Sequence, residues 1–130
     1  NAAFDWYRKA AAAGSVAAKG KLGACYAMGQ GTAKDEAKGI ELIKAAANAG
    51  DADSMHNLGV CYERGIGVPA DDTQAVMWYL KGAMAGCHEA MYNLSVCLAS
   101  GKGVEKDEAE AAMWKKKAKQ GGVPLRGRGQ

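Results

Sequence analysis

Few residues in this sequence are suited to chemistry, and their spacing does not favour it. The only local cluster is Cys87-His88-Glu89, and the other histidine of the chain is His56. Catalysis needs titratable groups that converge on one point, and we expect the two histidines on different helices. As a metal site the cluster lacks a second histidine four residues after His88, because position 92 is tyrosine. The sequence therefore predicts no catalytic residue, no metal ligand and no cofactor.

The cysteines follow a regular spacing, because Cys25, Cys61 and Cys97 recur at a step of 36 residues. An even number of cysteines in a short chain is typical of a disulfide framework. However, packed helices lie about 8 to 10 Å apart, which exceeds the Cα separation of about 7 Å that a disulfide allows. We therefore expect three small buried hydrophobes, whose free thiols weakly favour a reducing compartment, the cytosol or an organelle interior. Cys87 lies outside this series, and we expect it to be the most reactive thiol or the one bonded to a partner.

The cysteine spacing belongs to a repeat that organises the whole chain. Residues 51–86 match the sequence again when they are moved 36 positions in either direction. A fixed period of this size indicates a solenoid of stacked units. The expected division is as follows: 1–14, the second helix of an incomplete upstream repeat; 15–50, 51–86 and 87–122, whole repeats, the last partly a cap; and 123–130, a basic C-terminal tail. The sequence thus leads us to expect a chain that extends upstream of residue 1.

The first half of each repeat has the pattern of an amphipathic helix. Ala18, Leu22 and Cys25 are spaced i, i+4 and i+7, and their counterparts recur in the next two repeats. Gly23 follows the leucine directly, which predicts that another backbone approaches the helix there. Each of these helices ends at a Gly-x-Gly, where glycine favours the left-handed C-cap conformation. Phosphate binding is not indicated, because the dinucleotide fingerprint needs a third glycine and a preceding strand.

The second helix of each repeat is expected to begin at an aspartate that caps its free amides, namely Asp35, Asp71 or Asp107. Its buried stripe is predicted to be Ala75, Trp78 and Gly82 in the middle repeat, with Trp78 as the large buried anchor. The corresponding stripe of the last repeat is Ala111, Trp114 and Ala118.

Composition and charge describe an ordinary folded protein. The chain is 48% hydrophobic and 24% charged, with a net charge of +3. No apolar run approaches the ~20 residues that are needed to cross a bilayer. The basic excess gathers near the C-terminal end, at Lys115, Lys116, Lys117, Lys119, Arg126 and Arg128. These residues fit either the polar cap of a solenoid or a patch that contacts nucleic acid or an acidic surface.

The repeat motif resembles that of a known family. The middle repeat carries the pattern Leu58-Gly59, Tyr62, Gly65-x-Gly67-Val68, Asp71, Ala75, Trp78-Tyr79 and Gly86. This pattern resembles the Sel1-like repeat, a relative of the tetratricopeptide repeat, and the resemblance covers residues 3–122. The sequence departs from this pattern at Leu42-Ile43 in the first repeat and at Ser95 and Lys115 in the last. The resemblance implies an all-α fold, a right-handed α/α superhelix of about three and a half 36-residue helix-turn-helix repeats, whose first helices line the concave side.

By the tetratricopeptide analogy, the concave face should hold a strip of partner-binding residues. The predicted strip is Asp53, His56, Val60, Glu63, Glu89, Tyr92 and Val96. This mixture suits a partner helix or an extended segment that carries a basic residue. A clamp for an acidic terminus would need several lysines or arginines in the strip, and the strip has none.

The resemblance also implies a function, that of an adaptor or scaffold for protein complexes. The favoured hypothesis is a non-enzymatic scaffold, as a fragment or a peripheral subunit of a larger assembly, with a partner polypeptide in the concave groove. The alternative is contact with nucleic acid or an acidic surface through the basic C-terminal end. A third hypothesis is a hydrolase, because some cysteine-rich relatives are linked to penicillin binding or β-lactam hydrolysis. Those proteins pair two cysteines within each repeat, and this chain neither does so nor contains a Ser-x-x-Lys sequence.

Overall fold

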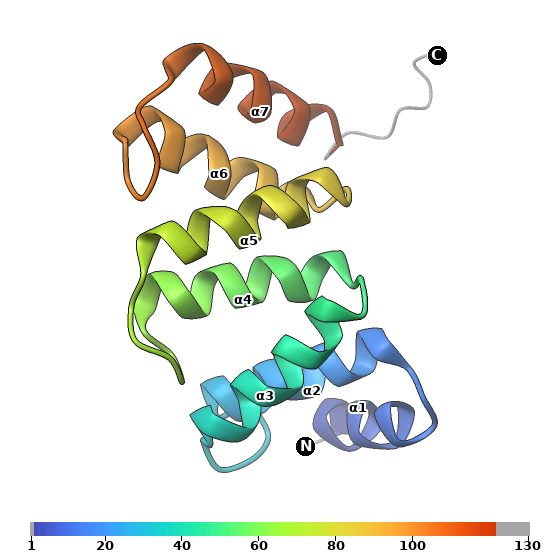
Figure 1. The fold of residues 1–130 in the computed structure, drawn as a ribbon. Helices are drawn as coiled ribbons and strands as arrows, with labels where there is room; N and C mark the ends of the chain where they lie inside the picture. The colour runs from blue at the N-terminus through green and yellow to red at the C-terminus, as the bar shows by residue number, and fades with distance from the viewer. Residues whose placement is uncertain (1, 122–130) are drawn as a thin grey trace.

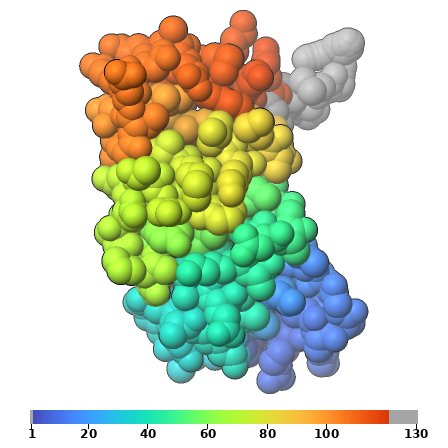
Figure 2. Space-filling view, in the orientation of Figure 1, coloured from blue at the N-terminus to red at the C-terminus, as the bar shows by residue number. Residues whose placement is uncertain are grey.

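The computed structural model describes residues 2–121, which form seven α-helices and no strand (Figure 1). The helices are α1 (Ala2–Ala12), α2 (Val16–Met28), α3 (Glu36–Asn48), α4 (Ala52–Arg64), α5 (Asp72–Met84), α6 (His88–Ser100) and α7 (Glu108–Gly121). They stack in chain order into an elongated body, as the sequence of colours along the space-filling view shows (Figure 2). The all-α helical-repeat fold predicted from the sequence is confirmed.

The polar residues predicted to start the second helices do so by capping. Asp35 and Asp71 each accept a hydrogen bond of 3.1 Å from the amide three residues on, and Asp107 accepts one of 2.9 Å. Each bond satisfies a helix amide that has no partner within its own helix. The start of each second helix is therefore encoded locally, before any packing occurs.

The first helices end at glycines, as the sequence predicts. Gly29, Gly65 and Gly101 have φ angles of 70°, 72° and 73°, the left-handed conformation that other residues rarely adopt. Their amides donate to the carbonyl oxygens of Cys25, Cys61 and Cys97 respectively. Each Gly-x-Gly is therefore a helix C-cap, which turns the chain toward the second helix.

The first helices lie along one side of the stack. Helix α4 contacts both α2 and α6, whereas α5 contacts neither α3 nor α7 within the described part of the chain. In a curved stack, elements that touch across successive repeats lie on the shorter, inner side. Helices α2, α4 and α6 therefore form the inner layer and α3, α5 and α7 the outer layer.

The core lies between the two layers and includes the predicted stripe of the first helices. The side chains at the three cysteine positions are 1% to 6% exposed, and Leu58 is fully buried. The predicted close approach also occurs. A Cβ atom on Gly23 would lie 2.8 Å from the carbonyl oxygen of Gly39, and one on Gly59 would lie 2.6 Å from the Tyr79 ring. These glycines let α3 and α5 pack directly on α2 and α4.

The predicted anchor of α5 is wrong by one residue. Trp78 is only half-buried, whereas its neighbour Tyr79 is fully buried against Gly59. Consecutive residues point about 100° apart on a helix, so the two rings have different neighbours, and Trp78 packs from the edge against the core cluster that includes Leu58 and Cys61. Ala75 and Gly82 are buried as predicted. In α7, Ala111 and Trp114 are buried, while Ala118 is only half-buried.

None of the helices in the described residues is both long enough and apolar enough to span a membrane.

Candidate partner-binding site

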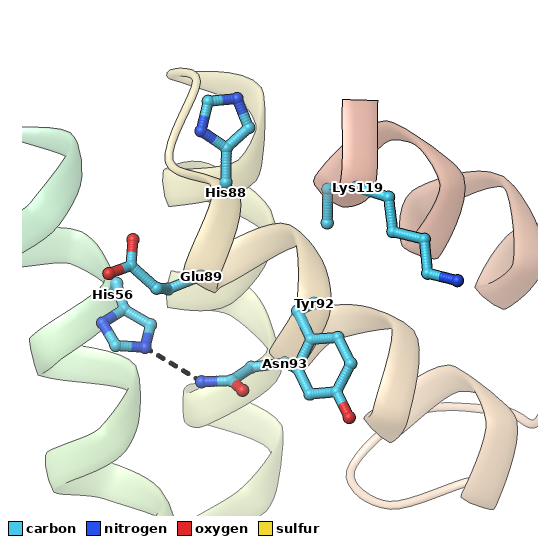
Figure 3. Close-up of a pocket in the computed structure, with 7 residues that line it drawn as sticks. His56, His88, Glu89, Tyr92, Asn93 and Lys119 are labelled. Atoms are coloured by element: carbon cyan, nitrogen blue, oxygen red, sulfur yellow. Dashed lines mark hydrogen bonds between the residues drawn. The ribbon is translucent and has the colours of Figure 1, made fainter. Parts of the chain in front are cut away.

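Two adjoining hollows open beside the last two repeats. The first has a volume of about 380 Å³ and is lined by His56, His88, Glu89, Tyr92, Asn93, Ala118 and Lys119 (Figure 3). The second has a volume of about 210 Å³ and is lined by Tyr92, Ser95, Val96, Ala99, Glu108, Ala111, Ala112 and Lys115. Tyr92 borders both hollows, which lie beside α6 and α7, and His56 of α4 lines the first. We call the two hollows together the end groove.

The end groove brings together part of the predicted strip. His56, Glu89 and Tyr92 line the first hollow, and Tyr92 and Val96 line the second. Tyr92 is 51% exposed and Val96 48% exposed, although both are large and carry much apolar surface. Exposed aromatic and apolar side chains in a groove are characteristic of binding surfaces.

The other three residues of the strip, Asp53, Val60 and Glu63, line neither hollow. Glu63 is held within the fold, because the Tyr79 hydroxyl donates to its Oε1 at 2.5 Å and the Lys102 ammonium lies 2.9 Å from its Oε2. The hydrogen bond from Tyr79 and the contact with Lys102 lower the pKa of Glu63, while burial raises the pKa of Tyr79. Val60 is half-buried against the core of the last repeats.

His56 connects α4 to α6. Its Nε2 lies 2.9 Å from the side-chain nitrogen of Asn93, and its ring centroid is 6.0 Å from that of Tyr79 (Figure 3). The pair is geometrically suited to a hydrogen bond in which Asn93 donates to an unprotonated Nε2. His56 is therefore a wall residue whose position depends on the packing of two repeats.

The expectation that Cys87 lies apart from the buried thiols is wrong. Cys87 is only 4% exposed, like the members of the cysteine series. Burial raises its pKa to about 11, and burial likewise raises the pKa of Cys61 to about 11. At neutral pH such thiols are almost entirely protonated and are weak nucleophiles. The sequence suggested an exposed thiol because Cys87 precedes α6 and lies outside the 36-residue cysteine series. In the structure, this position packs into the core.

Three potential metal ligands meet at the start of α6. The donor atoms of Asp53, Cys87 and Glu89 lie within 4.8 Å of one another, and the Cys87 thiol is 3.6 Å from the Glu89 carboxylate. Both carboxylates are exposed. A helix N-terminus carries a partial positive charge that attracts carboxylates. His88, which the sequence places beside Cys87, is not part of this group.

The basic residues of α7 point in different directions. Lys115 and Lys119 line the hollows, whereas Lys117 lies over the Trp114 ring with its ammonium 5.1 Å from the centroid. Lys116 lines neither hollow. The remaining members of the predicted patch, Arg126 and Arg128, lie outside the described residues.

Sequence reasoning missed the contribution of α7 to the groove. It considered only the first helices, so the end groove residues of α7 were not associated with Tyr92. The repeat spacing is the signal that could have identified these α7 residues. A shift of 36 residues places Ala112, Lys115 and Lys119 at the positions of Val76, Tyr79 and Ala83, which contribute to the core.

The fold and the groove define a class of protein, the α-helical repeat solenoids. Within this class the chain belongs to the Sel1 repeat family, whose model matches residues 1–15, 16–51, 52–87 and 88–123. Proteins of this family are generally scaffolds for protein interactions and are generally non-catalytic. A search of curated proteins found no significant match.

Solved structures give the same result. A Sel1 repeat protein from Oxalobacter formigenes matches with a TM-score of 0.85 and 34% identity, over 92% of this chain and 47% of that one. A protective antigen of uropathogenic Escherichia coli with an SLR fold matches with a TM-score of 0.83 and 35% identity, over 92% of this chain and 26% of that one. The chain thus spans about half and about a quarter of the lengths of these relatives. Cysteine-rich protein B of Helicobacter pylori, at 23% identity and a TM-score of 0.71 over 81% of this chain and 79% of that one, shares the fold.

Proposed function

We propose that this chain is a non-enzymatic scaffold that binds a partner polypeptide in the end groove, between α6 and α7, as part of a larger assembly. The observation that carries the proposal is the pair of adjoining hollows around Tyr92. Half-exposed Tyr92 and Val96 offer apolar area that a partner would remove from water, and burial of such area favours association. The residues that line the hollows come from two successive repeats, which suits a segment of chain more than a small molecule.

The non-catalytic part of the proposal draws support from the nucleophiles. All four thiols are free and buried, and their pKa values are raised by burial. The two histidines line the same hollow, yet His56 is engaged with Asn93. Among the described residues, no activated nucleophile stands beside a base in the way that acyl transfer requires.

The experiment is a cross-linked pull-down from the source organism with a groove variant and a matched control. The groove variant carries Tyr92→Ala and Val96→Ala. The control carries Met77→Ala and Leu80→Ala, which remove comparable exposed apolar side chains from the outer helix α5. Circular dichroism and urea titration establish that both variants are folded.

We expect the groove variant to lose a specific protein that the wild type and the control variant both retain. An identical set of captured proteins for all three chains would refute the proposal. The variant does not alter His56, because its contact with Asn93 would mix a loss of binding with a loss of stability.

Contact with nucleic acid is the alternative, favoured only by the four exposed lysines of α7. Nucleic-acid binding depends on cations that face the backbone together and weakens steeply with salt. Because the α7 lysines are divided between the groove, the Trp114 ring and the outer side, we expect only weak RNA binding. Tight RNA binding that falls by orders of magnitude between 50 and 200 mM salt would favour this alternative.

A further inference from the structure

The end groove has an occupied counterpart within the same molecule. A shift of 36 residues carries α4 onto α6 and α5 onto α7. In the interior of the stack, α6 lies against both α4 and α5 and fills the groove between them. No helix of the described chain takes the corresponding place against α6 and α7 (Figure 1). The end groove is therefore a helix-binding groove that the described part of the chain fills twice, with α4 and with α6, and leaves open once.

Exposure at equivalent positions shows the same difference. His56 and Val60, which lie beside α6, are partly covered. Their counterparts Tyr92 and Val96 are more exposed, at 51% and 48%. On the outer helix, the covered residues are Val76, Tyr79 and Ala83, which are 8%, 0% and 2% exposed. Their counterparts Ala112, Lys115 and Lys119 are all exposed. The five open positions surround the two hollows.

The charges of the open groove differ from those of the groove that α6 fills. In that filled groove the Tyr79 hydroxyl donates to Glu63. The counterparts of this pair are Lys115 and Ala99, so the cation faces a methyl group where an acceptor stood. Lys119 replaces Ala83 one turn further along α7.

Neither lysine is neutralised by the described part of the chain. Lys102 and Lys106 form ion pairs with Glu63 and Glu108, at 2.9 Å and 3.5 Å. Lys115 and Lys119 form no ion pair with a described residue. The acidic residue of the second hollow, Glu108, is already paired with Lys106. The α7 wall of the groove therefore presents two lysines that have no ion-pair partner among the described residues, with Glu89 in the first hollow and Glu108 in the second as the acidic groups of the lining.

We propose that the end groove binds an amphipathic helix of a partner protein, in the place that a further first helix would take. The partner helix carries small and aliphatic residues at i, i+4 and i+7, as α6 does with Ala90, Leu94 and Cys97, and carboxylates on the flank that faces Lys115 and Lys119. This inference rests on the proposed function and names the chemistry of the partner. Opposite charges at such a groove select the correct partner and its orientation.

The neighbouring segment of the chain does not fit this description. Residues 122–130 contain no aspartate or glutamate, and they include two arginines and a proline. Like charges in that segment would face Lys115 and Lys119, and Pro124 does not favour a continuous helix. Charge complementarity thus indicates an acidic partner.

The test uses two fluorescent, covalently stapled helical peptides of 13 residues, the length of α6. Both carry the Ala, Leu, Ala stripe of the α6 pattern, and they differ only in two flanking residues, which are Glu in one and Lys in the other. Fluorescence anisotropy measures their binding to the wild type, to a groove variant with Lys115→Glu and Lys119→Glu, and to a control variant with Lys44→Glu and Lys116→Glu. The two variants have the same net charge.

We expect the wild type and the control variant to bind the acidic peptide about tenfold more tightly than the basic one, the effect of two modest ion pairs. The groove variant should prefer the basic peptide. Equal affinity of the wild type for both peptides, or an acidic preference that survives in the groove variant, would overturn the inference. In that event a pull-down that still depends on Tyr92 and Val96 would leave the proposed function standing.

Two further results would also overturn it, because each identifies another occupant. One is a dimer in sedimentation velocity that the groove variant abolishes and that excludes both peptides, which would make a second copy the occupant. The other is peptide binding that begins only after deletion of residues 122–130, which would make that segment the occupant.

Discussion

Trp78 and Tyr79 are adjacent aromatic residues of α5 with different surroundings. Tyr79 is fully buried against Gly59 and donates a hydrogen bond to Glu63. Trp78 is half-buried, and its outer face carries the Lys81 ammonium 4.4 Å from the ring centroid. The repeat spacing indicates that both positions are special, but it does not determine which ring faces inward. That choice depends on the absent Cβ of Gly59, which gives the Tyr79 ring its space.

The two substitutions should therefore differ in cost. We expect Tyr79→Ala to lower the free energy of unfolding by about 3 to 5 kcal/mol, because it leaves a cavity and removes one of the two contacts of the Glu63 carboxylate. Trp78→Ala should cost about half as much, since much of that ring already contacts water. Urea denaturation of the two variants measures the difference. A larger loss for Trp78→Ala would contradict the assignment of Tyr79 as the anchor.

Glu63 should make the stability depend on pH in the acid range. Its pKa is lowered, first by the hydrogen bond from Tyr79 and then by Lys102, so the folded state binds its proton less tightly than the unfolded state does. Its contribution is therefore present above the usual glutamate pKa of about 4.3 and is lost as the pH falls through the lowered value. We expect wild type to exceed Glu63→Gln in stability at pH 7, with the gap closing below about pH 4. Thermal unfolding from pH 7 to pH 3 tests this, and a constant gap would contradict it.

The thiols should react slowly in the native protein and at similar rates. With a pKa near 11, Cys61 and Cys87 are about 100-fold less ionised at pH 8 than thiols with a pKa near 9. Burial slows attack further. We expect labelling by an aromatic disulfide reagent to be at least ~100-fold slower in buffer than in urea, with no fast phase. A fast phase in wild type that Cys87→Ser removes would restore the sequence-based expectation for Cys87.

At the scale of the elements, local sequence determines most of the structure. Aspartate caps start the second helices and left-handed glycines end the first ones, so the helix boundaries need no information from distant residues. The close approach of helices within a repeat is partly local as well. Gly23 indicates this close approach in the sequence. Gly39, which faces Gly23 from α3, is an isolated glycine whose role depends on the packing of the two helices. Such a role becomes visible only when both surfaces are known.

Gly39 should tolerate alanine poorly, although alanine favours a helix by about 1 kcal/mol. A Cβ at this position would lie 2.6 Å from the amide nitrogen of Ala27 and 2.7 Å from the carbonyl oxygen of Gly23. These are backbone atoms, so α2 and α3 must separate. We expect Gly39→Ala to lower the free energy of unfolding by about 1 to 3 kcal/mol. Glu41→Ala on the exposed side of α3 is the control, and a stabilised Gly39→Ala protein would show that the helices are not in backbone contact.

At the scale of the whole molecule, the candidate site follows from where the stack is open. The sequence identified Tyr92 and Val96 by analogy with other first helices, and both lie in the end groove. It treated His56 and Val60 as equivalent, yet α6 partly covers them because they belong to an interior repeat. A periodic sequence describes positions within a unit and not the neighbours of each unit. The end groove therefore depends on which neighbours each repeat has, and the repeat pattern does not contain that information.

The lysines of α7 should keep the open end from acting as a stacking surface. Tyr79 and Ala83 are buried and form part of the apolar surface on which α5 packs against the next helix. Lys115 and Lys119 put charges at the same positions of α7. Charges on an otherwise apolar stacking face oppose unintended association. We expect Lys115→Tyr with Lys119→Ala to increase self-association, seen as a concentration-dependent rise in the weight-average sedimentation coefficient relative to wild type. Lys44→Tyr with Lys116→Ala makes the same changes of type on the outer helices and should leave sedimentation unchanged. If both double variants sediment like the wild type, then Lys115 and Lys119 do not prevent self-association through this face. In that case the shape of the open end alone would prevent it.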